Sequence, residues 1–430
     1  MTTAEQREAI LAAVDARFDA QVAFTARLVA TPSLRGAEGA AQDLIEEEYR
    51  GLGLKVDRWT LDPAEVSQHP AAGAIDVDYS GSDVVVGTYL PAREAGRSLI
   101  LNGHVDVVPT GRPELWSRSP FESTILDGWL YGRGAGDMKA GLAASHHALA
   151  AVMAAGLRPT AHIHLQSVPE EESTGNGTVS ALQRGYHADA VVIPEPVGGD
   201  LVRAHVGVIW FRVRLTGEAA HAAEMAQGFN AVDAAYALIG DLRRLEARWN
   251  ADSASVRHFE ELVHPFNFNV GLICGGDWAS SVPDWCEFSM RVSFPPGQSA
   301  EDAWEQVLDA VAQSARDNPA LHGAAPAVAK TGFFADGYAL EPGSEAEEAL
   351  AEAFSSAAGR PLGSRTMTAY IDSRVYGLFD RTPSLVFGPV CERMHGADER
   401  VSLESLREVT RALALFIADW CGVEEDNSPR

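Results

Sequence analysis

A chain of 430 residues is too long for one ordinary hydrophobic core, so two domains are the starting expectation. Hydrophobic residues make up 46% of the chain and charged residues 22%, as is usual in soluble globular proteins. Acidic residues outnumber basic ones by 60 to 34, and the formal charge of −26 argues against nucleic acid or anionic membrane surfaces as partners.

The cysteines and the N-terminal segment indicate a reducing compartment. The four cysteines lack CxxC spacing, which argues against a disulfide framework and a structural zinc cluster; they are Cys274, Cys286, Cys391 and Cys421. The first ten residues lack the basic start and apolar core of a signal peptide, and no apolar run is long enough to span a bilayer. We therefore expect a cytoplasmic protein.

The first half of the chain alternates between helical and strand patterns. Ile10, Val14, Phe18 and Val22 recur every four residues, which predicts an amphipathic helix over 4–29. The further predictions are a helix over 40–52, a loop over 63–78, strands over 84–88, 99–105, 163–168 and 190–193, and an Ala-rich helix after Asp137. Alternation of this kind predicts an α/β domain with a mixed, mostly parallel sheet.

Near residue 206 the pattern changes to a compact α+β unit. The predicted elements are strands over 208–215, 267–273, 287–293 and 327–334, with helices over 230–249 and 300–315. The chain then returns to the first pattern, with helices over 345–358 and 403–421 and a strand over 384–388. We therefore expect residues 1–206 and 336–430 to form one domain, with 207–335 inserted into it.

Polar side chains gather where the predicted strands end. Alternation along 99–105 places His104 and Asp106 on one face at the carboxyl end, where open α/β sheets bind ligands. A carboxylate beside an imidazole fixes the tautomer of the ring, as in metal sites. Asp137, the glutamates 170–172, Glu195 and His395 follow other turns and strands. Each feature alone is as well explained by a surface turn, a solvated face or a strand cap, but together they suit zinc or a similar divalent metal.

The order of these motifs resembles the M20 metallopeptidases. The resemblance rests on GHVDVVP, DGWLYGRGAGDMKAG, the glutamate triplet with its glycine turn, IPEP and the final histidine, and it spans nearly the whole chain. The family includes acetylornithine deacetylase, succinyl-diaminopimelate desuccinylase, aminoacylase and glutamate-releasing carboxypeptidases. The resemblance implies a zinc-exopeptidase-like catalytic domain and an inserted ferredoxin-like lid domain over 207–335.

The resemblance also implies a two-metal site. Asp137 would bridge both ions, His104 and Glu195 would complete one, and Glu172 and His395 the other. Glu171 would be the general base, with Asp106 beside the metal ligand His104. The family usually has Asp-Glu-Glu where this chain has three glutamates, which puts Glu170 in the aspartate position. The peptide bond between Asp137 and Met138 would be cis.

The inserted unit carries further family-like motifs. His221, in GEAAHAAEMAQGFNAVDAA, would hold the scissile carbonyl, in many relatives across a dimer formed through the lid, and Asn230 of the same motif is a substrate-binding candidate. Arg291 would bind a substrate carboxylate, since guanidinium offers a planar pair of donors. Ser281 stands where many relatives have an asparagine, which puts that substrate contact in doubt.

These residues predict a metal-dependent amidohydrolase. We expect two divalent ions, zinc first with cobalt or manganese as alternatives, and a small N-acyl amino acid as substrate, as in acetylornithine deacetylase. A dipeptidase or carboxypeptidase of the same family is the main alternative, with a dipeptide as substrate. A non-catalytic binding protein on the same fold is a remote one, and a phosphohydrolase conflicts with the carboxylate-rich site.

Overall fold

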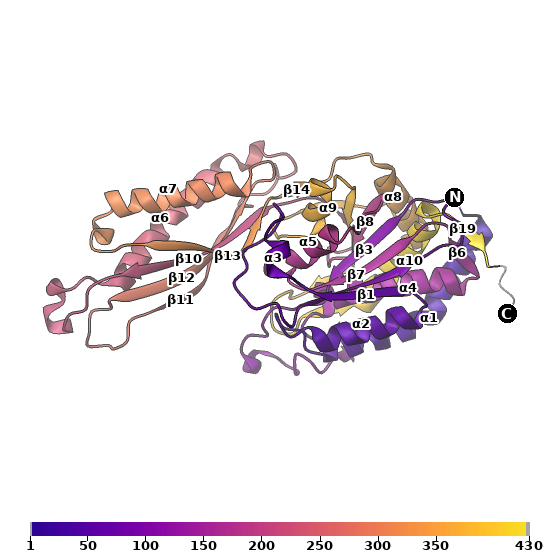
Figure 1. Cartoon of the computed structure of the whole chain (residues 1–430), viewed down its shortest axis with the longest axis horizontal. Helices are drawn as coiled ribbons and strands as arrows, with labels where there is room; N and C mark the ends of the chain where they lie inside the picture. Colours follow the sequence, from indigo (N-terminus) through magenta and orange to yellow (C-terminus); the bar gives the residue numbers. More distant parts are fainter. Residues whose placement is uncertain (1, 427–430) are drawn as a thin grey trace.

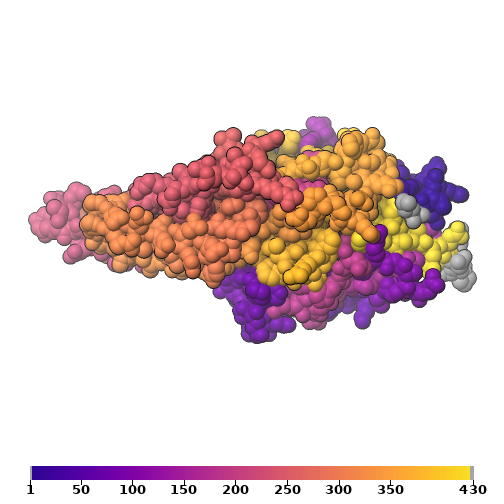
Figure 2. Space-filling view, turned by 90° about the horizontal axis from the view of Figure 1, so that it is seen from above, coloured from indigo at the N-terminus to yellow at the C-terminus, as the bar shows by residue number. Residues whose placement is uncertain are grey.

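The computed structural model describes residues 2–426 and shows an elongated molecule (Figure 1). A broad domain holds both ends of the described chain, and a narrow unit built from 207–335 extends from it (Figures 1 and 2). We call the narrow unit the lid. Within residues 2–426, no helix is both long and apolar enough to cross a bilayer.

A six-stranded mixed sheet forms the centre of the broad domain. Its order is β1 (Lys55–Thr60), β2 (Asp83–Tyr89), β7 (Ile163–Val168), β3 (Leu99–His104), β8 (Ala190–Ile193) and β16 (Ser384–Val386). The strands β7, β3, β8 and β16 run parallel, while at one edge β2 pairs antiparallel with both β7 and β1. The predicted α/β class with a mixed, mostly parallel sheet is confirmed.

Helices cover both faces of this sheet, because β3 is apolar on both sides. Leu99 and Leu101 face a core shared with α1 (Ala4–Ala30), α4 (Ala140–Ala154) and α10 (Leu403–Trp420). Ile100 faces the opposite core. That second core includes α5 (Asn176–Gln183) and α9 (Ser373–Phe379). Burial on both faces explains why β3 reads as a continuous apolar run rather than an alternating one.

Several elements differ from the sequence predictions in detail. The second helix, α2, spans Gly39–Gly51. The predicted loop over 63–78 contains one helical turn, α3 (Pro63–Val66), which starts at a proline after an aspartate cap. The sequence pattern missed β1, α5 and α9, which are short or weakly periodic.

The lid is one antiparallel sheet backed by two helices. Its order is β11 (Phe268–Gly275), β12 (Trp285–Phe294), β10 (Gly207–Thr216) and β13 (Ala327–Ala335). The helices α6 (Ala231–Ala251) and α7 (Ala300–Asp317) share a hydrophobic core with one face of this sheet. The other face carries the remaining side chains of β10 and β12.

Candidate metal centre and pocket

The metal-ligand candidates meet at the carboxyl ends of the parallel strands. His104 ends β3, the glutamate triplet follows β7, and Glu195 follows β8. Asp137 precedes α4, in a turn whose Asp137–Met138 peptide bond is cis, as predicted. The loop that follows β17 (Cys391–Glu392) brings in His395. The crossover connections between the strands thus bring together residues almost 300 positions apart in the sequence.

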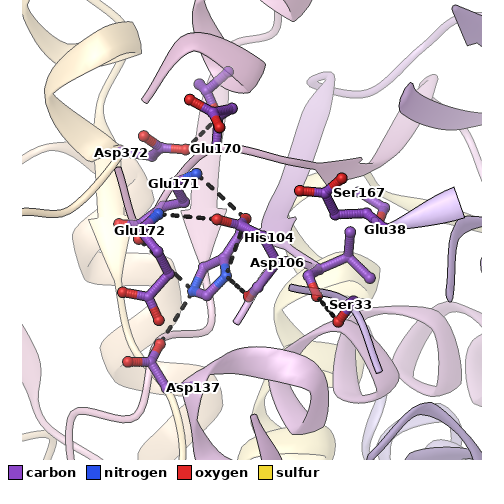
Figure 3. Close-up of polar contacts among 12 residues, drawn as sticks. Ser33, Glu38, His104, Asp106, Asp137, Ser167, Glu170, Glu171, Glu172 and Asp372 are labelled. Atoms are coloured by element: carbon purple, nitrogen blue, oxygen red, sulfur yellow. Dashed lines mark hydrogen bonds and ion pairs between the residues drawn. The ribbon is translucent and has the colours of Figure 1, made fainter. Parts of the chain in front are cut away.

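Asp137 lies between the two histidines (Figure 3 shows its contact with His104). Its Oδ1 is 3.1 Å from Nε2 of His104, and its Oδ2 is 3.2 Å from Nε2 of His395. Nε2 of His395 is also 3.1 Å from Oε2 of Glu172. Glu195 lies on the other side, with Oε1 3.7 Å from Nε2 of His104. The two carboxylate oxygens of Asp137 thus each face a different histidine.

Asp106 acts on the neighbouring loop more than on the imidazole (Figure 3). Nδ1 of His104 lies 2.9 Å from the main-chain oxygen of Asp106, and its carboxylate is farther away, at 3.6 Å. The Asp106 carboxylate instead accepts the main-chain N–H groups of Glu171, at 3.3 Å, and Glu172, at 3.1 Å. The residue therefore orients the ring through its backbone and fixes the glutamates through its side chain.

The three consecutive glutamates have three different environments. Glu170 is fully buried, has a positive φ of 69° and accepts two hydrogen bonds from Arg35. Glu171 is buried beside His104, with Oε2 3.8 Å from Nε2. Glu172 faces His395. The left-handed turn at Glu170 thus sends its side chain away from the centre and the next two into it.

Burial and mutual charge shift the pKa values in the centre. Burial raises the pKa of Glu171 well above its usual value, and burial with the nearby Asp137 charge does the same for Glu195. Burial also acts to raise the pKa of Asp137, but hydrogen bonds from His104 and His395 outweigh it and lower the pKa. The centre therefore concentrates negative charge that cations would balance.

The donor chemistry fits divalent cations. Two groups of donor atoms each lie within 4.8 Å of one another: His104, Glu171 and Glu195, and His104, Asp137 and Glu172. Imidazole nitrogens and carboxylate oxygens are the ligands that zinc and manganese sites use. Glu171 belongs to the first group. Its carboxylate is therefore close enough to the other donor atoms to act either as a general base or as a ligand of a cation bound there.

Two buried carboxylates support the centre from outside. Glu399 accepts the N–H groups of Gly136, at 3.1 Å, and Asp137, at 3.3 Å, and pairs with Arg133 at 2.5 Å. Asp372 accepts hydrogen bonds from Thr178, at 2.5 Å, and from the Tyr370 hydroxyl, at 2.7 Å. Such contacts hold the turn at Asp137 and the pocket wall in place.

A pocket of about 360 Å³ opens beside the centre and reaches the lid. Asp137, Glu171, Glu172, Glu195 and His395 lie along one side of its lining. The remaining lining is mostly apolar, with Pro196, Val197, Trp210, Phe333, Met367, Ala369, Tyr370, Ile371 and Met394, and its cation is Arg291. The volume suits a small molecule, since ligand sites start at about 300 Å³.

The other lid candidates lie away from this pocket. His221, Asn230 and Ser281 belong to the end of the lid beyond β10, where Asn230 and Ser281 line a separate depression and His221 pairs with Ser281 in a short bridge. The strand β10 has ten residues, so at about 3.3 Å per residue its far end is about 30 Å from Gly207. Asn230 caps α6 through the N–H groups of Val232 and Asp233. Within one chain the structure brings Arg291, but not these three residues, to the centre.

The sequence reasoning missed the aromatic lining of the pocket. Trp210 lies on β10 at the same parity as Arg212 and Arg214, which are exposed. A large aromatic residue on the polar face of an alternating strand is a signal for a binding surface. Tyr370 and Phe333 give no comparable signal, because they lie in a loop and near the end of a strand.

The fold and the centre define a metal-dependent hydrolase. The sequence matches the family described as Peptidase family M20/M25/M40 over residues 100–419, and the chain belongs to that family. The predicted family and hydrolase class are thus confirmed.

Named relatives act on an amide bond. The chain is 28% identical to N-formyl-4-amino-5-aminomethyl-2-methylpyrimidine deformylase of Halalkalibacterium halodurans, over 96% of this chain and 97% of the relative. It is 26% identical to the Bacillus subtilis protein of the same name, over 92% of each chain. Among solved structures, the Saccharomyces cerevisiae di-peptidase Dug1p has a TM-score of 0.79 at 13% identity, covering 97% of this chain and 99% of that one. Human carnosine dipeptidase 1 has a TM-score of 0.75 at 16% identity, covering 96% and 98%.

Proposed function

We propose that this chain is a two-metal deacylase that hydrolyses N-acyl amino acids. The observation that carries the proposal is Arg291, a cation that lines the same pocket as the metal ligands. Its guanidinium donates to the main-chain oxygen of Thr368 at 3.1 Å, and among residues 2–426 no carboxylate pairs with it. Burial lowers its pKa to about 10, so it is charged at neutral pH. A half-buried cation without a carboxylate partner calls for an anionic ligand, and a substrate carboxylate supplies one.

The side chains of the centre divide the reaction between them. Asp137 would be shared by two cations, with His104 and Glu195 on one side and Glu172 and His395 on the other. Bound divalent cations polarise an amide carbonyl and lower the pKa of water to about 7. Glu171, whose carboxyl pKa is raised by burial, would take one proton from the attacking water and deliver it to the leaving nitrogen. Water is thereby added across the C–N bond, which releases a carboxylic acid and an amine.

A second candidate substrate comes from the relatives. The bacterial proteins at 28% and 26% identity are named for deformylation of an aminomethylpyrimidine, and each is matched over more than nine-tenths of its length. The same centre would then remove a formyl group, the smallest acyl group, from an amine that bears a ring. The dipeptide alternative requires a partner for a free ammonium group, and the carboxylates of the pocket lining all belong to the metal centre.

We also propose that the enzyme is a cytoplasmic homodimer joined through the lid. The strand β11 is the edge of the lid sheet, and its Leu272 is 71% exposed beside Ile273. Tyr236 on the neighbouring helix α6 is 64% exposed. An exposed apolar edge strand is a surface for strand pairing. A partner seated there would explain how His221 could serve a centre that its own chain does not let it reach.

The test is hydrolysis by the purified protein loaded with zinc, cobalt or manganese. The panel holds N-formyl, N-acetyl and N-succinyl amino acids, N-formyl aminomethylpyrimidine and dipeptides, each with the Glu171→Gln variant beside it. We expect cleavage only with metal, and a loss of about 10²- to 10⁴-fold in kcat for Glu171→Gln with metal content unchanged. Glu348→Gln, on the exposed face of α8 (Glu345–Ala358), is the matched control. Full activity of Glu171→Gln would refute the assigned base, and cleavage of dipeptides alone would refute the deacylase.

A further inference from the structure

Trp210 and Arg291 form a direct cross-strand pair on the lid. They are register partners on the antiparallel strands β10 and β12, so their side chains leave the same face of the sheet. Directly opposed residues have Cβ atoms about 4.5 to 5.5 Å apart. Both side chains line the pocket beside the metal centre. Whatever Arg291 binds therefore lies within reach of the Trp210 ring.

Other rings hold this indole in place. Phe333 lies edge-on to Trp210, with ring centroids 5.0 Å apart and planes at 89°, and Tyr370 lies 4.2 Å from Phe333. Gly332 has a φ of +60°, and a Cβ there would come within 2.6 Å of Cε3 of Trp210. The indole thus packs against bare backbone, a contact that requires glycine. The Tyr370 hydroxyl is fixed by Asp372. Trp210, Phe333 and Tyr370 therefore form a rigid set of flat surfaces, which we call the wall.

We infer that Trp210 selects substrates whose amine half carries a flat aromatic ring. The inference rests on the proposed function: with the amide at the centre and a carboxylate on Arg291, the amino acid side chain faces the wall of Trp210, Phe333 and Tyr370. Aromatic rings pack edge-on or offset against such a wall with an energy beyond simple area burial. An amine half without a carboxylate can use the same wall.

The same lining disfavours a basic side chain. The side-chain ammonium group of an N-acyl ornithine or lysine would add a second cation, besides Arg291, to a pocket whose carboxylates all belong to the metal centre. Burying that charge without a partner is costly. Glycine and alanine would leave the aromatic surface without a contact. The wall therefore favours substrates with aromatic side chains over substrates with basic or small side chains.

The experiment compares N-formyl and N-acetyl derivatives of phenylalanine, alanine and ornithine with the zinc enzyme. The variants are Trp210→Leu, which removes the ring, and Trp210→Phe, which keeps one. Trp59→Leu is the matched control, because Trp59 is a half-buried tryptophan on β1, outside the lid and outside the pocket lining. We expect Trp210→Leu to raise KM for the phenylalanine substrates about tenfold or more, to leave the alanine substrates within about twofold, and to lose less as Trp210→Phe. Equal losses for phenylalanine and alanine substrates, or a preference for ornithine, would overturn the inference.

A binding measurement separates this inference from the proposed function. Calorimetry with the metal-loaded protein measures binding of free phenylalanine, benzylamine and alanine, the possible product amines and a ring-free reference. If no amide in the panel is cleaved but ring-bearing amines bind more tightly than alanine and lose that advantage in Trp210→Leu, the specificity wall stands and the deacylase proposal falls. If all three bind equally in the wild-type protein, the wall has no such role.

Discussion

Replacing Arg35 by methionine removes the cation that faces the first glutamate of the triplet. Two hydrogen bonds join Arg35 to Glu170, at 2.5 and 2.8 Å, and the Glu170 side chain is fully buried. Loss of one member of a buried ion pair costs about 3 to 5 kcal/mol. Arg35 is 24% exposed, and Tyr79 and Thr174 also donate to Glu170, so we expect the lower end, about 3 kcal/mol. We also expect kcat to fall about ten- to a hundredfold, because Glu171 follows directly on the chain.

The assay is urea unfolding followed by circular dichroism, with kcat measured on the same samples. Arg50→Met is the matched control, since Arg50 pairs with Glu46 on the surface and is 60% exposed; it should cost about 0.5 kcal/mol or less. Adding Glu170→Gln to Arg35→Met removes the stranded charge and should recover at least about 1 kcal/mol. The reasoning is refuted if Arg35→Met costs no more than Arg50→Met, or if the second substitution adds further destabilisation.

Three further predictions concern assembly, acid stability and metal. If the partner's lid completes each centre, mixing inactive His221→Ala with inactive Glu171→Gln should restore activity through hybrid sites; a mixture that stays inactive after subunit exchange excludes action in trans. Burial lowers the pKa of His146 to about 4 and of His147 to about 3, so the unfolded chain takes up protons below pH 6.5 that the folded chain does not, and stability falls as the pH falls. His147→Gln should therefore lose about 1.4 kcal/mol less than the wild type between pH 7.5 and 5.5 in urea unfolding; an identical loss contradicts the shift. Removing the bound cation with a chelator should lower the free energy of unfolding by about 2.7 kcal/mol, compared with protein in a free cation concentration a hundredfold above the Kd. Calorimetry that shows no change in stability would contradict a cation at the centre.

The sequence predicted the elements whose periodicity is local. The helix over 4–29 and the strands at 99–105 and 163–168 match α1, β3 and β7 within two residues at each end. The ligand candidates could be found because each follows a strand or a glycine turn, and parallel strands end at one edge. The same argument does not predict which candidates contact each other. The contact between His395 and Asp137 depends on a loop far along the chain in which His395 has a positive φ.

The environment of Glu170 shows the limit more clearly. Glu170 is the same amino acid as the two residues that follow it. Two features distinguish its environment from theirs: a positive φ and an ion pair with Arg35, which lies 135 residues earlier in the chain. The aspartate expected at this position in the family is one methylene shorter. A glutamate reaches the guanidinium of Arg35, the Tyr79 hydroxyl and Thr174 together, which ties the triplet to two distant loops. Composition and periodicity carry no information on contacts of this range.

The strand β10 divides the work of the lid along its length. Near Gly207 it places Trp210 opposite Arg291, over the centre of its own chain. About 30 Å farther on, it leads to His221, which faces no part of that centre. Under the proposed function, each chain would select its substrate with its own Trp210. The His221 that holds the scissile carbonyl would come from the other chain of the dimer. Because the two roles lie at opposite ends of one rigid sheet, a substitution at Trp210 should alter the choice of substrate without altering subunit exchange. A substitution at the exposed Leu272 of β11 should weaken the dimer and lower kcat for every substrate alike.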